Sequence, residues 1–113
     1  MSRIYKILPR QAWEAAAAAG RFTGAGVDLA DGYIHFSTAA QAPETAARYF
    51  AGQADLMVLE VESEALGPAL RWEAARGGDL FPHLYAPLPT AAVLSARSAP
   101  LGADGVPILG ALS

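Results

Sequence analysis

Cysteine is absent from this sequence of 113 residues. That absence excludes disulfide bonds, thiolate zinc sites, iron–sulfur clusters and thiol nucleophiles. The chain also carries little charge of either sign, with 8 basic and 11 acidic residues and a formal net charge of −3. Because duplex nucleic acid is bound through many cationic contacts to phosphates, and no basic cluster occurs here, we expect no binding to duplex nucleic acid.

Long apolar stretches are also missing. No run approaches the roughly 18 residues that a membrane-spanning helix needs, and the first residues do not resemble a secretion signal. We therefore expect no membrane association and a cytoplasmic location. The length of 113 residues fits one compact domain. Eleven glycines and eight prolines favour short elements joined by turns over a helical bundle.

The pattern of apolar residues predicts the order of the elements. We expect strands over 4–8, 33–37, 56–61 and 91–97, helices over 11–19 and from 39 to about 50, and a short extended piece over 70–73. Residues 21–31 are expected to form a loop, and 80–88, with two prolines, an edge strand or a loop. This order predicts a single α+β domain with a small, split, mixed or antiparallel sheet and two main helices.

A column of polar side chains follows the second predicted strand. Alternation along the strand places Tyr33, His35 and Ser37 on one face and the intervening apolar residues on the other. Thr38, with a glutamine three residues later, fits a capping box at a helix start, where free N–H groups favour an anion. The column predicts a polar pocket for an oxyanion or a ribose. The alternative is that His35 is a structural histidine and Ser37 only assists the cap.

A second polar patch lies further along the chain. Arg71 and Glu73 share one face of the extended piece, and His83 and Tyr85 repeat this arrangement after a Gly-Gly loop. If this patch meets the first, both histidines line one cleft, in which Arg71 would bind a phosphate or carboxylate. The alternative is a surface ion pair, either between Arg71 and Glu73 or between Arg76 and Asp79. The histidines are far apart in the chain and show no metal-ligand spacing, so we expect no metal site.

Several of these segments together resemble a bacterial family of small proteins, the domain-of-unknown-function family 952. The matching positions are 4–7, 13, 31–37, 41, 45–46, 49–50, 70–73 and 81–85. They span the chain from about residue 3 to residue 100. The resemblance implies membership of this family, whose activity is not established.

At a greater distance the layout is similar to the ADP-ribosyltransferase-like fold, particularly the tRNA 2′-phosphotransferases. These proteins also have a short strand, a helix ending in glycine, and then a histidine–hydrophobic–serine strand, here 35–37. The resemblance implies a cleft for NAD or an ADP-ribose-like ligand and a reaction through an oxocarbenium-like sugar. It implies that His35 and Ser37 hold ribose hydroxyls, that Arg71 holds phosphate and that Glu73 stabilises the sugar cation.

The chain departs from that transferase pattern in three respects. Tyr5 and Lys6 stand where transferases often have a histidine or arginine and a glycine. No catalytic glutamate loop is evident, Glu73 being the candidate. The arginine set is matched at most by Arg71 and Arg76. The resemblance therefore implies a binding site more directly than a reaction.

Two classes of function are consistent with these observations. The first is a small domain that binds a nucleotide-like or phosphorylated ligand, with NAD or ADP-ribose as a candidate cofactor and with transferase chemistry or acid–base hydrolysis by the two histidines as candidate reactions. Its candidate catalytic residues are His35, Glu73 and His83, and its candidate ligand-binding residues are Tyr33, Ser37, Thr38, Arg71 and Tyr85. The second is a non-catalytic interaction module with a degenerate pocket, docked through the proline-rich segment 82–89 or a C-terminal arm over 102–113.

Overall fold

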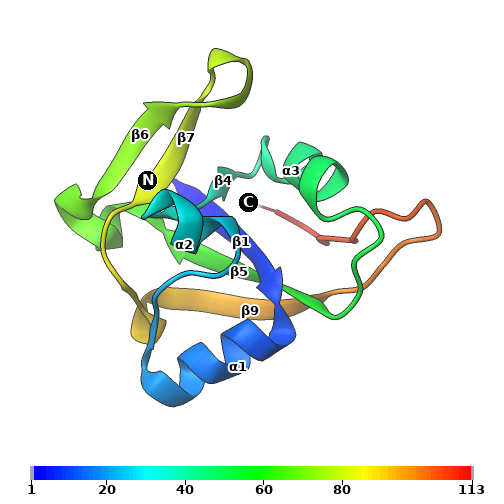
Figure 1. Ribbon diagram of the computed structural model, residues 1–113, viewed down its shortest axis with the longest axis horizontal. Helices are drawn as coiled ribbons and strands as arrows, with labels where there is room; N and C mark the ends of the chain where they lie inside the picture. The colour runs from blue at the N-terminus through cyan, green and yellow to red at the C-terminus, as the bar shows by residue number, and fades with distance from the viewer. Residues whose placement is uncertain (1, 113) are drawn as a thin grey trace.

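The larger sheet of the structure forms around β1 (Arg3–Pro9) and β5 (Leu56–Glu62), which pair antiparallel along their whole lengths. A computed structural model describes residues 2–112 (Figure 1). The sheet has the order β4-β1-β5-β9, with β4 at Ser37–Thr38 and β9 at Val93–Ala99, and the register of β5 and β9 shifts between Glu60 and Val61, where β9 has one extra residue. Residues 4–8 are all buried because both faces of the sheet are covered.

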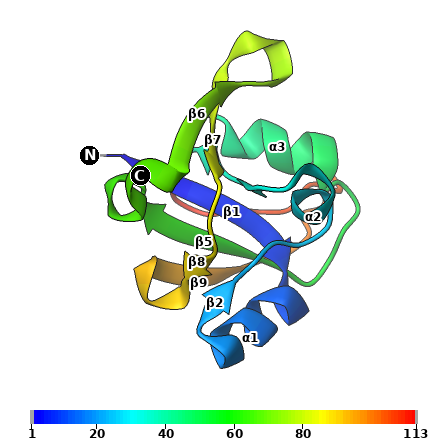
Figure 2. The same cartoon turned by 60° about the vertical axis from the view of Figure 1, so that its left-hand side comes forward.

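A second sheet has the order β3-β7-β6, formed by β3 (Ile34–His35), β7 (Leu80–Leu84) and β6 (Leu70–Ala74). Its β6–β7 hairpin projects from the rest of the molecule (Figure 2). Consecutive residues of one segment serve both sheets, since β3 joins this sheet and β4 joins the larger one. The named strands pair antiparallel in both. A third pair joins β2 (Arg21–Phe22) to β8 (Leu88–Pro89).

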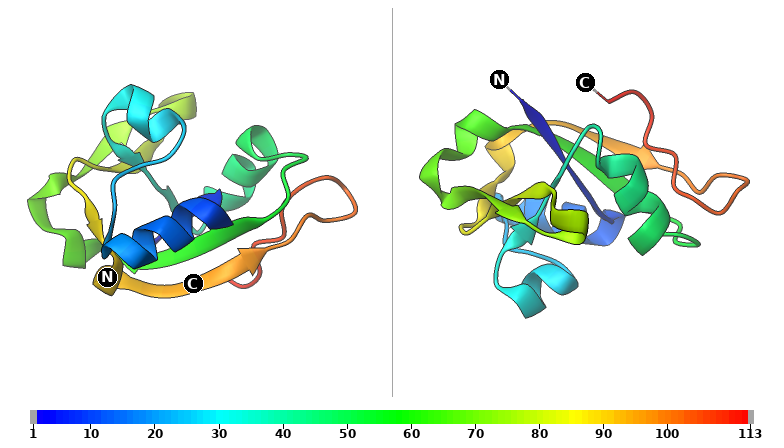
Figure 3. Two further views of the ribbon diagram at one scale, coloured as in Figure 1. Left: turned by 60° about the horizontal axis from the view of Figure 1, so that its bottom comes forward. Right: turned by 90° about the horizontal axis from the view of Figure 1, so that it is seen from above.

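Two helices cover opposite faces of the larger sheet. Helix α1 (Arg10–Ala19) packs with Leu8 and Leu59 in one apolar cluster. Helix α3 (Ala42–Tyr49) packs with Ile7 and Val58 in another (Figure 3). Helix α1 ends at Gly20, whose φ of 83° is the left-handed conformation that glycine adopts easily, as the sequence predicts. The short helix α2 (Val27–Asp31) and the 3₁₀ turns η1 (Ser63–Ala69), η2 (Arg76–Gly78) and η3 (Thr90–Ala92) complete the regular structure.

The α+β class is confirmed, but three local predictions were wrong. Residues 21–31 are not a loop, because they contain β2 and α2. The strand predicted over 33–37 is broken at Phe36, where the chain passes from one sheet to the other. The segment with two prolines contains β7, the central strand of its sheet. The nitrogen and the carbonyl of a strand residue point toward the same neighbouring strand, and the carbonyl of Pro82 accepts the N–H of Phe36. The nitrogen of Pro82, which has no hydrogen to donate, therefore faces the break between β3 and β4, and the proline is tolerated.

The C-terminal segment, predicted as an arm over 102–113, packs on the domain in its described part, and residue 113 lies outside the described residues. Leu109 is buried in the cluster beneath α3. The carbonyl of Gly105 accepts the backbone N–H of Gly52 at 2.7 Å, and the guanidinium of Arg97 donates to the carbonyl of Ala111 at 3.0 Å. No helix within residues 2–112 is long and apolar enough to cross a membrane.

Candidate functional site

A cavity of about 620 Å³ opens between β1, α2, α3 and the β6–β7 hairpin. Its volume lies within the range of roughly 300–1,000 Å³ that is usual for small-molecule sites. Polar and aromatic side chains from distant parts of the chain line it, among them Lys6, Tyr33, His35, Ser37, Thr45, Tyr49, Arg76, Phe81 and His83. The cavity is therefore the place to look for a function.

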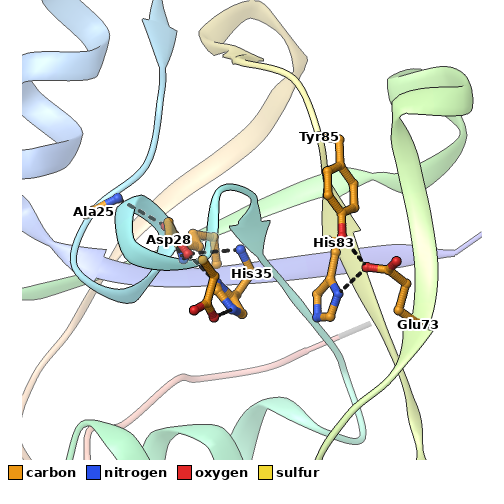
Figure 4. A network of polar contacts seen from close by, with 8 residues as sticks. Ala25, Asp28, His35, Glu73, His83 and Tyr85 are labelled. Carbon is orange, nitrogen blue, oxygen red and sulfur yellow. Dashed lines mark hydrogen bonds and ion pairs between the residues drawn. The ribbon is translucent and has the colours of Figure 1, made fainter.

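Beside the cavity, the carboxylate of Asp28 on α2 gathers donors from three segments. It lies 2.9 and 2.8 Å from the Lys6 ammonium, 3.1 Å from the Ala25 N–H, 3.0 Å from the His35 N–H and 2.6 Å from the Nδ1 of His35 (Figure 4). Burial raises the pKa of Asp28, but the hydrogen bonds from His35 and the charge of Lys6 outweigh it and lower this pKa to about 2. Burial in turn lowers the pKa of Lys6, against the attraction of Asp28.

His35 is held at both ring nitrogens. Its Nδ1 is bound to Asp28, and its Nε2 lies 2.9 Å from Oδ2 of Asp31 at the end of α2. This histidine is therefore fixed in position. It contributes the surface of its ring to the cavity wall, because both ring nitrogens already have partners. Two residues further along the chain, Ser37 shares a hydrogen bond of 2.9 Å with the hydroxyl of Thr45 on α3.

His83 on β7 has one bound nitrogen and one free one. Its Nδ1 lies 2.8 Å from Oε1 of Glu73, and the same oxygen accepts the hydroxyl of Tyr85 at 2.7 Å (Figure 4). The bonds from Tyr85 and His83 lower the pKa of Glu73, so its carboxylate is an acceptor and Nδ1 carries the hydrogen. Among residues 2–112, Nε2 of His83 has no hydrogen-bond partner. In the neutral ring this nitrogen is an acceptor.

Tyr33 joins the two histidines. Its ring centroid lies 4.5 Å from that of His35, 4.3 Å from that of His83 and 5.0 Å from that of Tyr85. The two imidazole rings themselves are 5.4 Å apart, because β3 pairs His35 directly with His83 on β7. The two polar patches of the sequence thus meet, which the sequence left as a condition.

Four residues proposed for the site lie outside the cavity lining. Arg71, on the edge strand β6, lies 4.7 Å over the ring of Tyr85 instead. Glu73 and Tyr85 stand behind His83, so they position its ring. Thr38 forms the capping box, with reciprocal bonds of 3.0 and 3.2 Å to Gln41. The functional roles proposed for these residues stay predictions.

The arginine that does line the cavity is Arg76, in the turn η2 between β6 and β7. Its position depends on how the hairpin folds over α3, which the sequence does not indicate. The pairing of Lys6 with Asp28 was also not predicted from the sequence. The signal for Lys6 is a charged residue inside the otherwise apolar run 4–8, whereas Asp28 lies in a short polar stretch that looks like a loop. No group of three or more potential metal ligands occurs among the described residues.

The antiparallel sheets and the few helices around this cavity make the chain a single α+β domain. The chain belongs to the family described as protein of unknown function, DUF952, whose model matches residues 7–96. The family expected from the sequence is therefore confirmed.

Solved structures from the bacterium Caulobacter crescentus are similar to this chain over nearly all of its length. The crystal structure of its protein CC0527 is 58% identical, with 96% of each chain covered and a TM-score of 0.93. A double mutant of CC0527 is 56% identical with the same coverage and TM-score. The solution NMR structure is 58% identical, with 95% of this chain and 92% of that chain covered and a TM-score of 0.85. No curated protein matches the chain. The ADP-ribosyltransferase-like fold stays a prediction, since these structures are all of CC0527.

Proposed function

We propose that the cavity binds a nucleotide-like or phosphorylated small molecule, of the class to which NAD and ADP-ribose belong. The observation that carries this proposal is the convergence of His35 and His83, 5.4 Å apart, on one cavity together with Arg76. Tyr49 and Phe81 in the lining supply faces on which a base can stack. The imidazole and the guanidinium supply partners for hydroxyls and for an anion.

The pair of His83 and Glu73 also supports group-transfer chemistry on such a ligand. A carboxylate that fixes the tautomer of a histidine leaves the other nitrogen free to take a proton. In such a step Nε2 of His83 accepts the proton of an attacking hydroxyl. The hydroxyl oxygen forms a bond to the anomeric carbon of the ligand's sugar, while the bond from that carbon to the leaving group breaks and its electron pair departs with the leaving group. Glu73 then stabilises the imidazolium, and the ring of His35 forms part of the wall against which the ligand lies. In this proposal Glu73 positions His83 and does not contact the sugar.

Thermal-shift measurements with NAD, ADP-ribose, nucleoside monophosphates, ribose 5-phosphate and simple carboxylic acids test the binding proposal. We expect saturable stabilisation by a phosphorylated probe, reaching a rise in Tm of roughly 10 °C at a hundredfold excess over Kd. His83→Gln should reduce this shift, whereas Arg21→Gln, on an exposed residue of β2, should preserve it.

The proposal fails if no probe shifts the wild-type Tm, or if His83→Gln responds as the wild type does. A protein that binds no probe but co-purifies with a stable partner would be the interaction module instead. The packing of Leu109 into the domain already gives that alternative less support than the sequence did, because the C-terminal segment is not a free arm.

A further inference from the structure

We infer that Arg76 is the anion-binding residue of the cavity and that, together with His83, it selects a phosphate ester of a sugar. This inference rests on the proposed function, because it names the ligand class of the same site. It assigns to Arg76 the role that the sequence suggested for Arg71.

The guanidinium of Arg76 is enclosed by aromatic rings. Its central carbon lies 4.8 Å from the ring centroid of Phe81 and 5.5 Å from that of Tyr49, and its side chain is only 16% exposed. The turn that places it contains Gly77 and Gly78, both at positive φ, where a side chain would be strained. Arg76 is thus held at the cavity by packing, which leaves its N–H groups available.

The charge of Arg76 is poorly neutralised by the protein. Its Nη2 lies 3.3 Å from the neutral hydroxyl of Thr45. Within residues 2–112, the carboxylate paired with it is that of Glu44, which is 3.6 Å from Nε and 60% exposed, and Arg48 shares it at 3.3 Å. By contrast, the guanidinium of Arg10 contacts the carboxylate of Asp55 directly. The guanidinium of Arg76 is largely buried and only weakly paired, so it favours an additional anion. The planar fork of an arginine suits a phosphate.

The place of Arg76 relative to His83 limits what else the ligand carries. Arg76 contacts the ring of Phe81, which lies two residues before His83 on the same face of β7. A ligand that contacts both residues therefore carries an anion for Arg76 and, at another point, a hydrogen donor for His83, because Nε2 of His83 is an acceptor in the neutral ring. A sugar with a phosphate ester and a free hydroxyl meets both conditions.

Isothermal titration with ribose 5-phosphate, AMP, adenosine and inorganic phosphate tests the inference on wild type, Arg76→Gln and Arg71→Gln. We expect Arg76→Gln to weaken ribose 5-phosphate or AMP by about 10- to 100-fold, as loss of a charge-assisted hydrogen bond does. Adenosine, which has no phosphate, should bind wild type and Arg76→Gln with the same affinity. Arg21→Gln serves as the charge-matched control, and Glu44→Gln should hold phosphate probes at least as tightly as wild type, because it removes a competing carboxylate.

The outcomes separate this inference from the proposed function. If phosphate probes bind wild type and Arg76→Gln equally, or lose affinity only in Arg71→Gln, the role of Arg76 is wrong and the cavity remains a ligand site. If inorganic phosphate binds as tightly as ribose 5-phosphate, selection by His83 is wrong. If no probe binds wild type, both proposals fail. Equal binding of ribose 5-phosphate and AMP would indicate a sugar phosphate, and binding of AMP alone a nucleotide.

Discussion

At the scale of single residues, Asp28 organises the region beside the cavity. Only 2% of this residue is exposed, yet its carboxylate accepts bonds from the Lys6 ammonium, the His35 ring and two backbone N–H groups. An ion pair in such a place contributes little over an apolar pair of the same shape, but removing one partner leaves the other charge buried and unpaired. Asp28 therefore fixes His35 at the cavity and makes the fold sensitive to its own loss.

Replacing Asp28 with alanine should destabilise the protein strongly. The Lys6 ammonium and two backbone donors lose their acceptor, so we expect Asp28→Ala to reduce the free energy of unfolding by about 3–5 kcal/mol in urea denaturation. The double variant Lys6→Met/Asp28→Ala no longer buries an unpaired ammonium and should be more stable than Asp28→Ala alone. A double variant as unstable as the single one would contradict this account.

The lowered pKa of Asp28 predicts how stability falls in acid. This carboxyl titrates near pH 2 in the folded protein and near its ordinary value of 3.8 in the unfolded chain. The contribution of its charge is therefore complete above pH 4 and is lost as the pH falls through about 2, since the unfolded chain binds the proton first. The difference corresponds to about 2 kcal/mol.

Asp28→Asn supplies the comparison for this pH dependence. The free energy of unfolding of wild type, measured in urea from about pH 5 to pH 2, should fall by about 2 kcal/mol more than that of the variant. The remaining carboxyl groups are common to both proteins, so their contributions cancel in the comparison. Parallel pH profiles would show that Asp28 does not titrate as described.

At the scale of elements, the turn that leads into α3 is held by reciprocal bonds between Thr38 and Gln41, and Gln41 is the N-cap of the helix. Thr38 accepts the N–H of Gln41, and Gln41 accepts the N–H of Thr38 in return. Thr38→Ala removes one of these acceptors, so we expect it to reduce the free energy of unfolding by about 1 kcal/mol. Thr38→Ser keeps the hydroxyl and should stay close to wild type in the same urea titration. If serine and alanine are equally destabilising, the hydroxyl is not the cause.

The elements that the sequence predicts well are those whose signals are local. Gly20 ends α1 through its own backbone angle, as predicted. Thr38 and Gln41 do bond reciprocally, but across a turn, and α3 begins at Ala42 and not directly after Thr38. Helix α2 escapes prediction because five residues bounded by glycines show no helical period. The central position of β7 escapes it because Pro82 is acceptable only beside a break in the neighbouring strand, and that break is a tertiary feature.

The same distinction holds for the candidate site. Alternation along two strands places His35 and His83 on the faces that meet, so their proximity follows from the sequence once the strands pair. The choice between Arg71 and Arg76 does not follow, because it depends on how the hairpin turn lies over α3. The pairing of Lys6 with Asp28 likewise joins two segments that only the packing of α2 on β1 brings together.

At the scale of the whole molecule, the larger sheet is buried on both faces by different parts of the chain. One face carries α1 and the smaller sheets, and the other carries α3 and the C-terminal segment. The cavity opens where the two sheets diverge around Phe36, so its walls come from both halves of the fold. The C-terminal segment completes the apolar cluster beneath α3, which gives it a structural role.

Two neighbouring residues of that segment test this role directly. Leu109 is 8% exposed and belongs to the same apolar cluster as Ala42 and Ala46 of α3, whereas Ile108 is 54% exposed. Leu109→Ala should therefore reduce the free energy of unfolding by about 2–3 kcal/mol, while Ile108→Ala should change it by less than about 0.5 kcal/mol. Both variants remove apolar side-chain carbons at adjacent positions, so a general effect of shortening side chains in the segment would appear in both. Urea denaturation that finds Leu109→Ala as stable as Ile108→Ala would mean that the segment does not hold α3 in solution, and the docking arm predicted from the sequence would regain its support.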